Sequence, residues 1–253
     1  MNMTKEDRQG VIYIFIAMSI ATVLVYLAIS VNKKNKYDEV TLCPLEIPYE
    51  TTVVIIDKSD KWGDADSLHI KNLLKAVSRK LQKFERLIIK VIEPTENANI
   101  TVKTYFDMCN PGAKANPFYE NPRRILKKYT QFFKEPLEEL LQMLARPEVS
   151  KSTPLLSVIR DTLVENTGKI NLVIVSDFME YSKEYDFYKH IPSQSEIYKK
   201  LDMPTDKLKS LQAEYIMRQR IRKKINDAIT FYKNLTYRLG GTFSQKQIIT
   251  MEN

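Results

Sequence analysis

One run of apolar residues near the amino terminus restricts the structures that this chain can adopt more than any other feature. Residues 10–31 read GVIYIFIAMSIATVLVYLAISV and contain no charged side chain, and Arg8 and Lys33 lie on either side. As a helix at 1.5 Å per residue the run would extend about 33 Å, enough to cross a hydrocarbon core of roughly 30 Å. Its twelve Val, Ile, Leu and Phe residues favour insertion by roughly 4–7 kcal/mol. The sequence predicts a transmembrane helix over residues 10–31, preceded by a tail over 1–9.

A cleaved signal peptide is the competing interpretation of this run. Ala28-Ile29-Ser30 resembles a cleavage site, but the run is longer than the roughly 7–15 apolar residues of a signal peptide. A buried helix of a globular protein is rarely apolar on every side. We therefore expect an uncleaved anchor and a single-pass membrane protein.

The side of the membrane on which the rest of the chain lies is less constrained. Lys5 and Arg8 precede the run and three lysines follow it within residues 33–36, so the positive-inside rule weakly favours a cytoplasmic domain. Two observations favour the opposite side. A very short N-terminal tail commonly stays in the cytoplasm, and Cys43 and Cys109 could form a disulfide in an oxidising compartment. We expect a bacterial inner-membrane protein whose domain is periplasmic, with the cytoplasmic side as the alternative.

Charge and cysteine content exclude few classes of function. The net charge of +8 is spread along the chain, which does not by itself indicate a nucleic-acid partner. Two cysteines are too few and too far apart in sequence for a zinc site, and the sequence does not decide whether they form a disulfide. Basic helix faces at residues 123–128 and 218–224 suit solvated surface, anionic lipid or, less well, nucleic acid, because acidic residues are interspersed.

The remainder divides into a juxtamembrane linker over residues 32–50 and one domain over 51–253. Short β-branched runs alternate with stretches whose apolar residues recur every three or four positions. The expected strands cover residues 52–57, 86–93, 100–106, 171–177 and 242–250. The expected helices cover 65–83, 123–145, 154–166, where Ser152 or Thr153 would be the N-cap, and 206–239. This order predicts an α/β fold: a doubly wound, mostly parallel sheet with helices on both faces.

Polar side chains follow two of the expected strands. Asp57 and Asp177 each end a buried apolar run, and the carboxyl ends of parallel strands form the ligand crevice of such a sheet. Ser59 and Asp60 follow Asp57, and Thr153 lies at an expected helix start. These oxygen ligands suit Mg²⁺ or Mn²⁺. Taken singly, each residue also suits a strand end, a loop or a helix cap.

These residues together resemble the von Willebrand factor A (vWA) family. Its pattern is a first strand ending in Asp-x-Ser-x-Ser, a later Thr-Pro-Leu, and an Asp after the fourth strand. The matching segments are Asp57-Lys-Ser59-Asp-Lys61, Thr153-Pro-Leu155 and Val175-Ser-Asp177.

The resemblance implies that Asp57, Ser59 and Thr153 ligate a divalent cation, with Asp177 close by, and that an acidic side chain of a partner protein completes the coordination. One departure is Lys61, which replaces the second Ser, because an ammonium group cannot ligate a metal. Asp60 is an additional oxygen ligand beside it.

An aromatic stretch directly follows Asp177. Phe178, Tyr181, Tyr185 and Phe187 lie among charged residues, and aromatic side chains often anchor protein interfaces. We expect a partner-binding surface there, with a loop that packs on its own aromatic rings as the alternative.

We expect no enzymatic activity, because nucleophile, phosphate-binding and zinc-hydrolase motifs are absent from the sequence. The predicted function is a membrane-anchored vWA-like module that binds another protein within a larger envelope-associated complex, with Mg²⁺ or Mn²⁺ as its cofactor. One alternative is a metal-dependent hydrolase or nuclease using Asp57, Asp60 and Asp177. The other is a structural subunit whose metal site is inactive.

Overall fold

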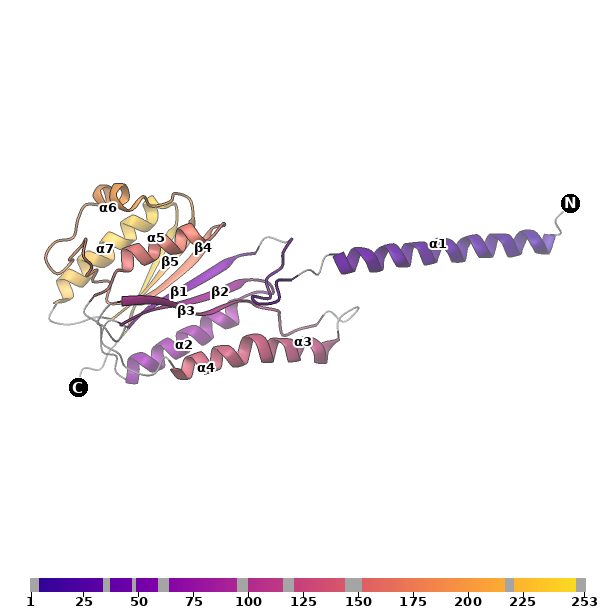
Figure 1. The fold of residues 1–253 in the computed structure, drawn as a ribbon, viewed down its shortest axis with the longest axis horizontal. Helices are drawn as coiled ribbons and strands as arrows, with labels where there is room; N and C mark the ends of the chain where they lie inside the picture. Colours follow the sequence, from indigo (N-terminus) through magenta and orange to yellow (C-terminus); the bar gives the residue numbers. More distant parts are fainter. Residues whose placement is uncertain are drawn as a thin grey trace.

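A long apolar helix and an α/β domain make up the structure of this chain (Figure 1). The computed structural model describes residues 5–33, 37–46, 49–58, 64–94, 100–115, 121–143, 152–216 and 221–248. The expected strands and helices lie within these ranges except at some of their ends and at residues 217–220, within the expected helix over 206–239.

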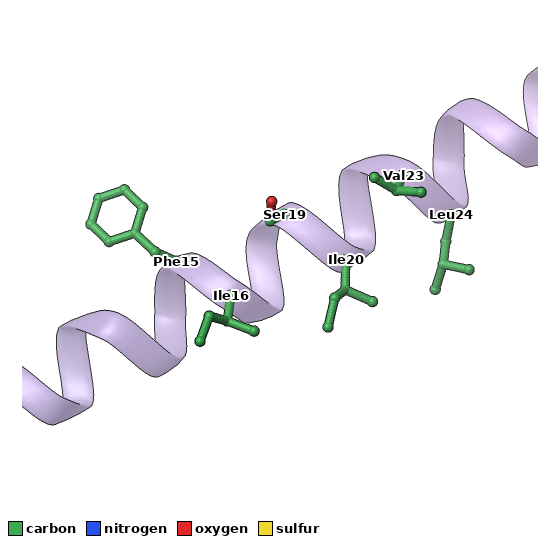
Figure 2. Close-up of a pocket in the computed structure, with 6 residues that line it drawn as sticks. All are labelled: Phe15, Ile16, Ser19, Ile20, Val23 and Leu24. Atoms are coloured by element: carbon green, nitrogen blue, oxygen red, sulfur yellow. The ribbon is translucent and has the colours of Figure 1, made fainter.

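The first helix, α1 (Lys5–Lys33), contains the apolar run. Within it, Gln9–Leu27 is long and apolar enough to cross a membrane, and none of that segment is buried against the domain. Figure 2 shows Ile16, Ile20 and Leu24 projecting from one side of the helix, with Ser19 as the hydroxyl-bearing residue among those drawn. A helix with these properties is either a membrane anchor or a signal sequence.

One six-stranded sheet forms the centre of the domain, in the order β3-β2-β1-β4-β5-β6. The strands are β1 (Thr51–Asp57), β2 (Arg86–Pro94), β3 (Ile100–Cys109), β4 (Ile170–Ser176), β5 (Leu208–Ile216) and β6 (Thr242–Ile248). All neighbouring strands are parallel except β2 and β3, which pair in antiparallel fashion. The expected α/β fold with a mostly parallel sheet is confirmed.

Helices cover both faces of the sheet (Figure 1). The helices are α2 (Asp64–Lys80), α3 (Pro122–Tyr129), α4 (Glu135–Met143), α5 (Leu155–Glu165), α6 (Gln194–Leu201) and α7 (Arg222–Arg238). Residues of α2 and α4 share one buried cluster with the sheet, and residues of α5, α6 and α7 share the other. Ile55 and Ile56 on β1 are fully buried, one in each cluster. This is why the central strands are apolar throughout rather than alternating.

The prediction of one helix over residues 206–239 is wrong in its first third. Leu208–Ile216 is strand β5, and helix α7 starts at Arg222. The register of β5 against β4 shifts opposite Ile170 and Asn171, so Leu208 and Leu211 both lie in the same core cluster. This irregularity spaces two core residues three positions apart, which imitates the spacing of a helix.

Two other helix predictions need correction. The expected helix over 123–145 runs from Pro122 to Met143 but contains a π-helical turn, Thr130–Lys134, which places Phe133 in the core with no exposed surface. The N-cap of α5 is Pro154, whose side chain makes no capping hydrogen bond, and not Ser152 or Thr153. Within α2, Leu68 is exposed and lies outside the buried stripe.

A disulfide joins the segment after α1 to the sheet. Cys43 and Cys109 are bonded, with their Cα atoms 4.9 Å apart and 66 positions between them in sequence. Cys109 pairs with Arg86 at the start of β2, and Thr51, at the start of β1, pairs with Arg86 from the other side. The chain therefore leaves α1 and enters the domain at the amino ends of the parallel strands. The carboxyl ends lie about 20 Å away, at roughly 3.3 Å for each residue of β1.

Candidate functional site

The candidate site lies where the direction of the sheet's connections reverses. The chain leaves β1 for α2 on one face and leaves β4 for α6 on the other, and β1 and β4 are neighbours in the sheet. Ligands of open α/β sheets bind beyond the carboxyl ends of the two strands at such a switch point. Figure 1 shows these ends on the side of the sheet opposite to α1.

Asp57 and Asp177 end the two strands that form the switch point. Ile56 pairs with Val175, so Asp57 lies opposite Ser176, and the Ser176 hydroxyl donates a 2.7 Å hydrogen bond to Asp57 Oδ2. Asp57, Ser176 and Asp177 are each less than 5% exposed. The structure thus brings the two aspartates to one edge of the sheet. Ser176, which is not among the predicted site residues, links the side chains at the ends of the two strands.

Asp177 begins a tightly held loop. Its Oδ1 accepts a 2.9 Å hydrogen bond from the Met179 N–H, and its Oδ2 lies 3.5 Å from the Tyr188 hydroxyl. The next residue, Phe178, has φ of +62°, which is a strained backbone conformation for a bulky side chain. The Ser176 hydroxyl accepts the Phe178 N–H at 2.9 Å and helps to hold that conformation. Strained residues held in this way cluster at functional sites.

Thr153 is tied to the same loop. Its N–H donates to the Tyr181 carbonyl at 2.7 Å, and the Tyr181 N–H donates back to the Thr153 carbonyl at 3.1 Å. Ser152 adds a 2.6 Å hydrogen bond from its hydroxyl to the same Tyr181 carbonyl. Thr153 is 5% exposed. The loop before α5 and the loop after β4 therefore form one unit at the carboxyl edge.

Glu180 is a third carboxylate in this unit and was not predicted from the sequence. Its Oε2 accepts the Leu156 N–H at 2.8 Å, so it caps the start of α5, which Pro154 does not do. The pKa of Glu180 is raised to about 7, mainly by burial; the negative charge of Asp57 acts in the same direction, and the hydrogen bond from the Leu156 N–H opposes both. A carboxyl group with this pKa exchanges protons near neutral pH.

Tyr232 of α7 completes the interior of the site. Its side chain is fully buried, and within the described part of the chain its hydroxyl has no hydrogen-bond partner. Burial raises the Tyr232 pKa well above its usual value, and the charges of Glu180, Asp57 and Asp177 add to the effect. The three carboxylates therefore act electrostatically on one buried phenol. An orphaned buried hydroxyl beside them is the kind of group that a bound water or ligand satisfies.

The chemistry of this donor set fits a hard divalent cation. Asp57, Asp177 and Thr153 offer carboxylate and hydroxyl oxygens, which Mg²⁺ and Mn²⁺ prefer. Among the described residues no group of three or more His, Cys, Asp or Glu side chains is arranged to hold a metal. A complete ligand set would therefore need hydroxyl groups or Ser59 and Asp60, which lie, with Lys61, outside the described residues.

The aromatic residues after Asp177 are mostly core residues. Phe178, Tyr185 and Phe187 are at most 7% exposed, and the Phe178 and Phe187 rings pack against Tyr232 with centroids 5.2 and 6.2 Å away. Buried rings cannot anchor a partner in this conformation. Tyr181, at 44% exposed, is the one of the four predicted interface residues that lies on the surface. The rings of Phe178 and Phe187 are turned inward, as the alternative expected, but the aromatic rings that they pack against belong to α7.

A buried glutamate and a partly exposed histidine are paired on the other face of the sheet. His69 Nε2 of α2 is 3.0 Å from Glu214 Oε2 of β5, and Gln212 donates to Glu214 Oε1 at 2.6 Å. Glu214 is 1% exposed. Because both its oxygens are bonded to neighbouring side chains, we assign this glutamate to the core rather than to a reactive site.

The comparisons with known proteins do not add a family. No protein-family model matches the chain, and no curated protein is similar to it in sequence. The geometry at the carboxyl ends of β1 and β4 and the apolar helix at the amino terminus are the observations from which a function can be inferred.

Proposed function

We propose that this chain is a membrane-anchored, vWA-like module that binds another protein at the carboxyl edge of its sheet, with Mg²⁺ or Mn²⁺ at the binding site. The observation that carries the proposal is the Ser176–Asp57 hydrogen bond of 2.7 Å, because it joins the two strands at the switch point. Asp177 and Thr153 belong to the loops that meet there. Asp57 at the end of the first strand, Thr153 in a later loop and Asp177 after the fourth strand follow the vWA order.

The proposed metal site would combine Asp57, Thr153 and Asp177 with Ser59. The cation would supply an open coordination position for an acidic side chain of the partner protein, while Ser176 would orient Asp57. Three carboxylates within a buried edge repel one another, and a divalent cation would relieve that repulsion. The site would then act within a larger envelope-associated complex, as expected from the anchor.

The membrane part of the proposal is supported by the apolar side chains of α1. The segment Gln9–Leu27 is wholly exposed in the isolated chain, and an apolar helix without a protein neighbour is stable in lipid rather than in water. The Cys43–Cys109 disulfide favours an oxidising compartment, and so a periplasmic or other extracytoplasmic domain. A reporter fused to the C-terminus tests the side. The mass of the mature chain shows whether the apolar helix is retained, and its removal would exclude the anchor.

Thermal melting of the full chain in nanodiscs tests the metal part. At a metal concentration near 100 times the dissociation constant, binding adds about 2.7 kcal/mol of stability, or roughly 5–10 °C for a domain of this size. We expect Mg²⁺ or Mn²⁺ to raise the melting temperature of the wild type and not of D57N. Asp227 is exposed on α7, so D227N makes the same charge change as a control and should respond like the wild type.

Metal, activity and partner-capture experiments together distinguish the interaction module from the structural subunit and from the enzyme. If neither cation changes the melting temperature and D57N leaves capture of a crosslinked partner unchanged, a structural subunit with an inactive site is the better description. Metal-dependent hydrolysis of a phosphodiester that is lost in D177A would favour an enzyme. Partner capture that needs both the cation and Asp57 supports the interaction module.

A further inference from the structure

We infer that α3 is a lipid-contacting helix: its exposed basic side rests on the anionic headgroups of the membrane that α1 crosses. The inference rests on the proposed membrane anchor and concerns a different surface from the carboxyl edge. Three observations carry it, namely the composition of α3, its position beside the segment that follows α1, and the distribution of charge along the helical segment that it begins.

The exposed side of α3 is basic and partly apolar. The helix reads PRRILKKY, contains no acidic residue and has no buried residue. Arg123, Arg124, Lys127 and Lys128 are exposed, as is Leu126 at 53%. Arginine and lysine bind phosphate groups, and an apolar side chain among them suits the boundary between headgroups and acyl chains. The side that faces the domain consists of the partly buried Ile125 and Tyr129.

The position of α3 is fixed by contacts with the segment that follows α1. Ile125 and Lys128 line a cavity of about 70 Å³ together with Tyr37, Leu42 and Phe84. The rings of Tyr37 and Phe84 also lie 5.6 Å apart, centroid to centroid. Leu42 precedes the disulfide-bonded Cys43. The linker, the amino edge of the sheet and α3 therefore pack together as one corner of the domain.

This corner cannot move far from the membrane. α1 ends at Lys33, and the four residue steps to Tyr37 span at most about 14 Å when fully extended. That limit holds whichever way the linker bends. In Figure 1, α3 also extends past the amino ends of the strands in the direction of α1. The tether gives the basic side a high effective concentration at the lipid surface, so modest attraction suffices for contact.

Charge is distributed unevenly along the helical segment. Its first part, α3, carries four basic residues, whereas α4, at the end away from the linker, begins with Glu135 and also carries Glu138 and Glu139. An anionic surface would attract the first part and repel the second. The basic residues of α3 therefore lie at the end that would contact the lipid, and the acidic residues of α4 lie at the other end. A helix that is solvated along its whole length needs no such separation of charge.

Quenching by brominated lipids tests the contact in the full chain. The single native tryptophan is first replaced in W62F, and a reporter is introduced as L126W. Leu68, on the first half of α2, is 59% exposed and lies toward the opposite edge of the sheet, so L68W is a matched control. The proteins are reconstituted into vesicles of brominated phosphatidylcholine, alone or mixed with brominated phosphatidylglycerol.

We expect strong quenching of L126W in the vesicles with phosphatidylglycerol, weak quenching in neutral vesicles and none of L68W. High salt should reduce the quenching of L126W, since the Debye length falls to about 3 Å at 1 M. Each basic residue near an anionic surface changes the ratio of docked to free α3 roughly fivefold. Adding R123Q and K127Q should therefore lower that ratio about 30-fold. Equal quenching in both vesicle types, or no quenching of L126W, would overturn the inference. Flotation of the same samples reports the anchor: protein that floats without quenching of L126W refutes the lipid contact alone, whereas protein that does not float refutes the anchor.

Discussion

Replacing Glu180 by Gln should change how the stability of the domain depends on pH. The folded-state pKa of Glu180 is about 7 and the unfolded value is 4.5. Below about pH 4.5 both states hold the proton and the carboxyl group has no effect on stability. As the pH rises from about 4.5 to 7, the unfolded state ionises first, so the folded state loses stability relative to it. Above about pH 7 the loss is complete.

The size of the effect follows from the same two pKa values. A difference near 2.5 units at about 1.4 kcal/mol per unit gives a loss of about 3 kcal/mol in the wild type at alkaline pH. E180Q has no such loss and keeps an oxygen that accepts the Leu156 N–H. The gain of E180Q over the wild type should therefore grow by about 3 kcal/mol between acidic and alkaline pH. In melting temperature this is roughly 6–12 °C for a domain of this size.

Melting curves of the full chain in detergent micelles, followed by circular dichroism, measure this gain. Glu184 lies in the same loop but is exposed, so E184Q makes the same charge change at the surface. We expect its difference from the wild type to be nearly independent of pH. Any constant offset in E180Q reflects the fit of the amide and is not part of the prediction. A difference between E180Q and the wild type that stays flat from about pH 5 to pH 8.5 would refute the buried, ionisable carboxylate.

Three further changes test other parts of the fold. Reducing the disulfide, or replacing both Cys43 and Cys109 by Ser, should cost about 4 kcal/mol, because the bond closes a loop with a sequence separation of 66; an unchanged denaturation midpoint would contradict the bond. F133A should cost about 3–5 kcal/mol in urea unfolding, whereas F132A, at a 41% exposed position, should cost much less. H69A should cost about 1–3 kcal/mol by removing a hydrogen-bond partner of a buried glutamate on β5, and unaltered urea unfolding would argue against that hydrogen bond.

The strands nearest the site could be predicted from sequence because burial on both faces gives them an unmistakable composition. Thr51–Asp57 and Ile170–Ser176 are β-branched, apolar on both sides and followed or ended by an acid. Parallel neighbours then place those acids together without further information. The apolar run of α1 is recognisable for a similar reason, since it lacks the polar face of a surface helix.

Strand β5 was missed because its sequence pattern is not that of a regular strand. The register shift beside Ile170 puts Leu208 and Leu211 in one core cluster, and polar residues lie between them. The shift arises from the pairing of β5 with β4, which the sequence of β5 alone does not show. The spacing of its apolar residues therefore predicts a helix. Tertiary pairing then overrides the local pattern, as it often does for strands.

The remaining site residues depend on contacts that no local pattern encodes. Glu180 caps α5 from 24 positions away, and the charges of the carboxylates act on Tyr232, which lies on a helix later in the chain. Ser176 differs from these residues, because a small hydroxyl residue directly before Asp177 at a strand end is a signal that the sequence carries, although Ser176 was not among the predicted site residues. Charged residues separate the aromatic residues after Asp177 and favour a surface position for them, whereas the loop folds the rings of Phe178 and Phe187 inward onto Tyr232.

The two edges of the sheet carry opposite charges, and this affects the direction from which a partner protein would approach the proposed module. The basic helix α3 and the Cys43–Cys109 bond lie at the amino edge, next to the linker, whereas Asp57, Asp177 and Glu180 lie at the other edge. A domain held against lipid through its amino edge would present its acidic edge about 20 Å farther from the membrane. Contact through α3 would also limit tilting, and so keep that edge turned away from the bilayer. A partner that needs the carboxylates would therefore approach from the aqueous side, and loss of the α3 contact should weaken its binding without altering the site itself.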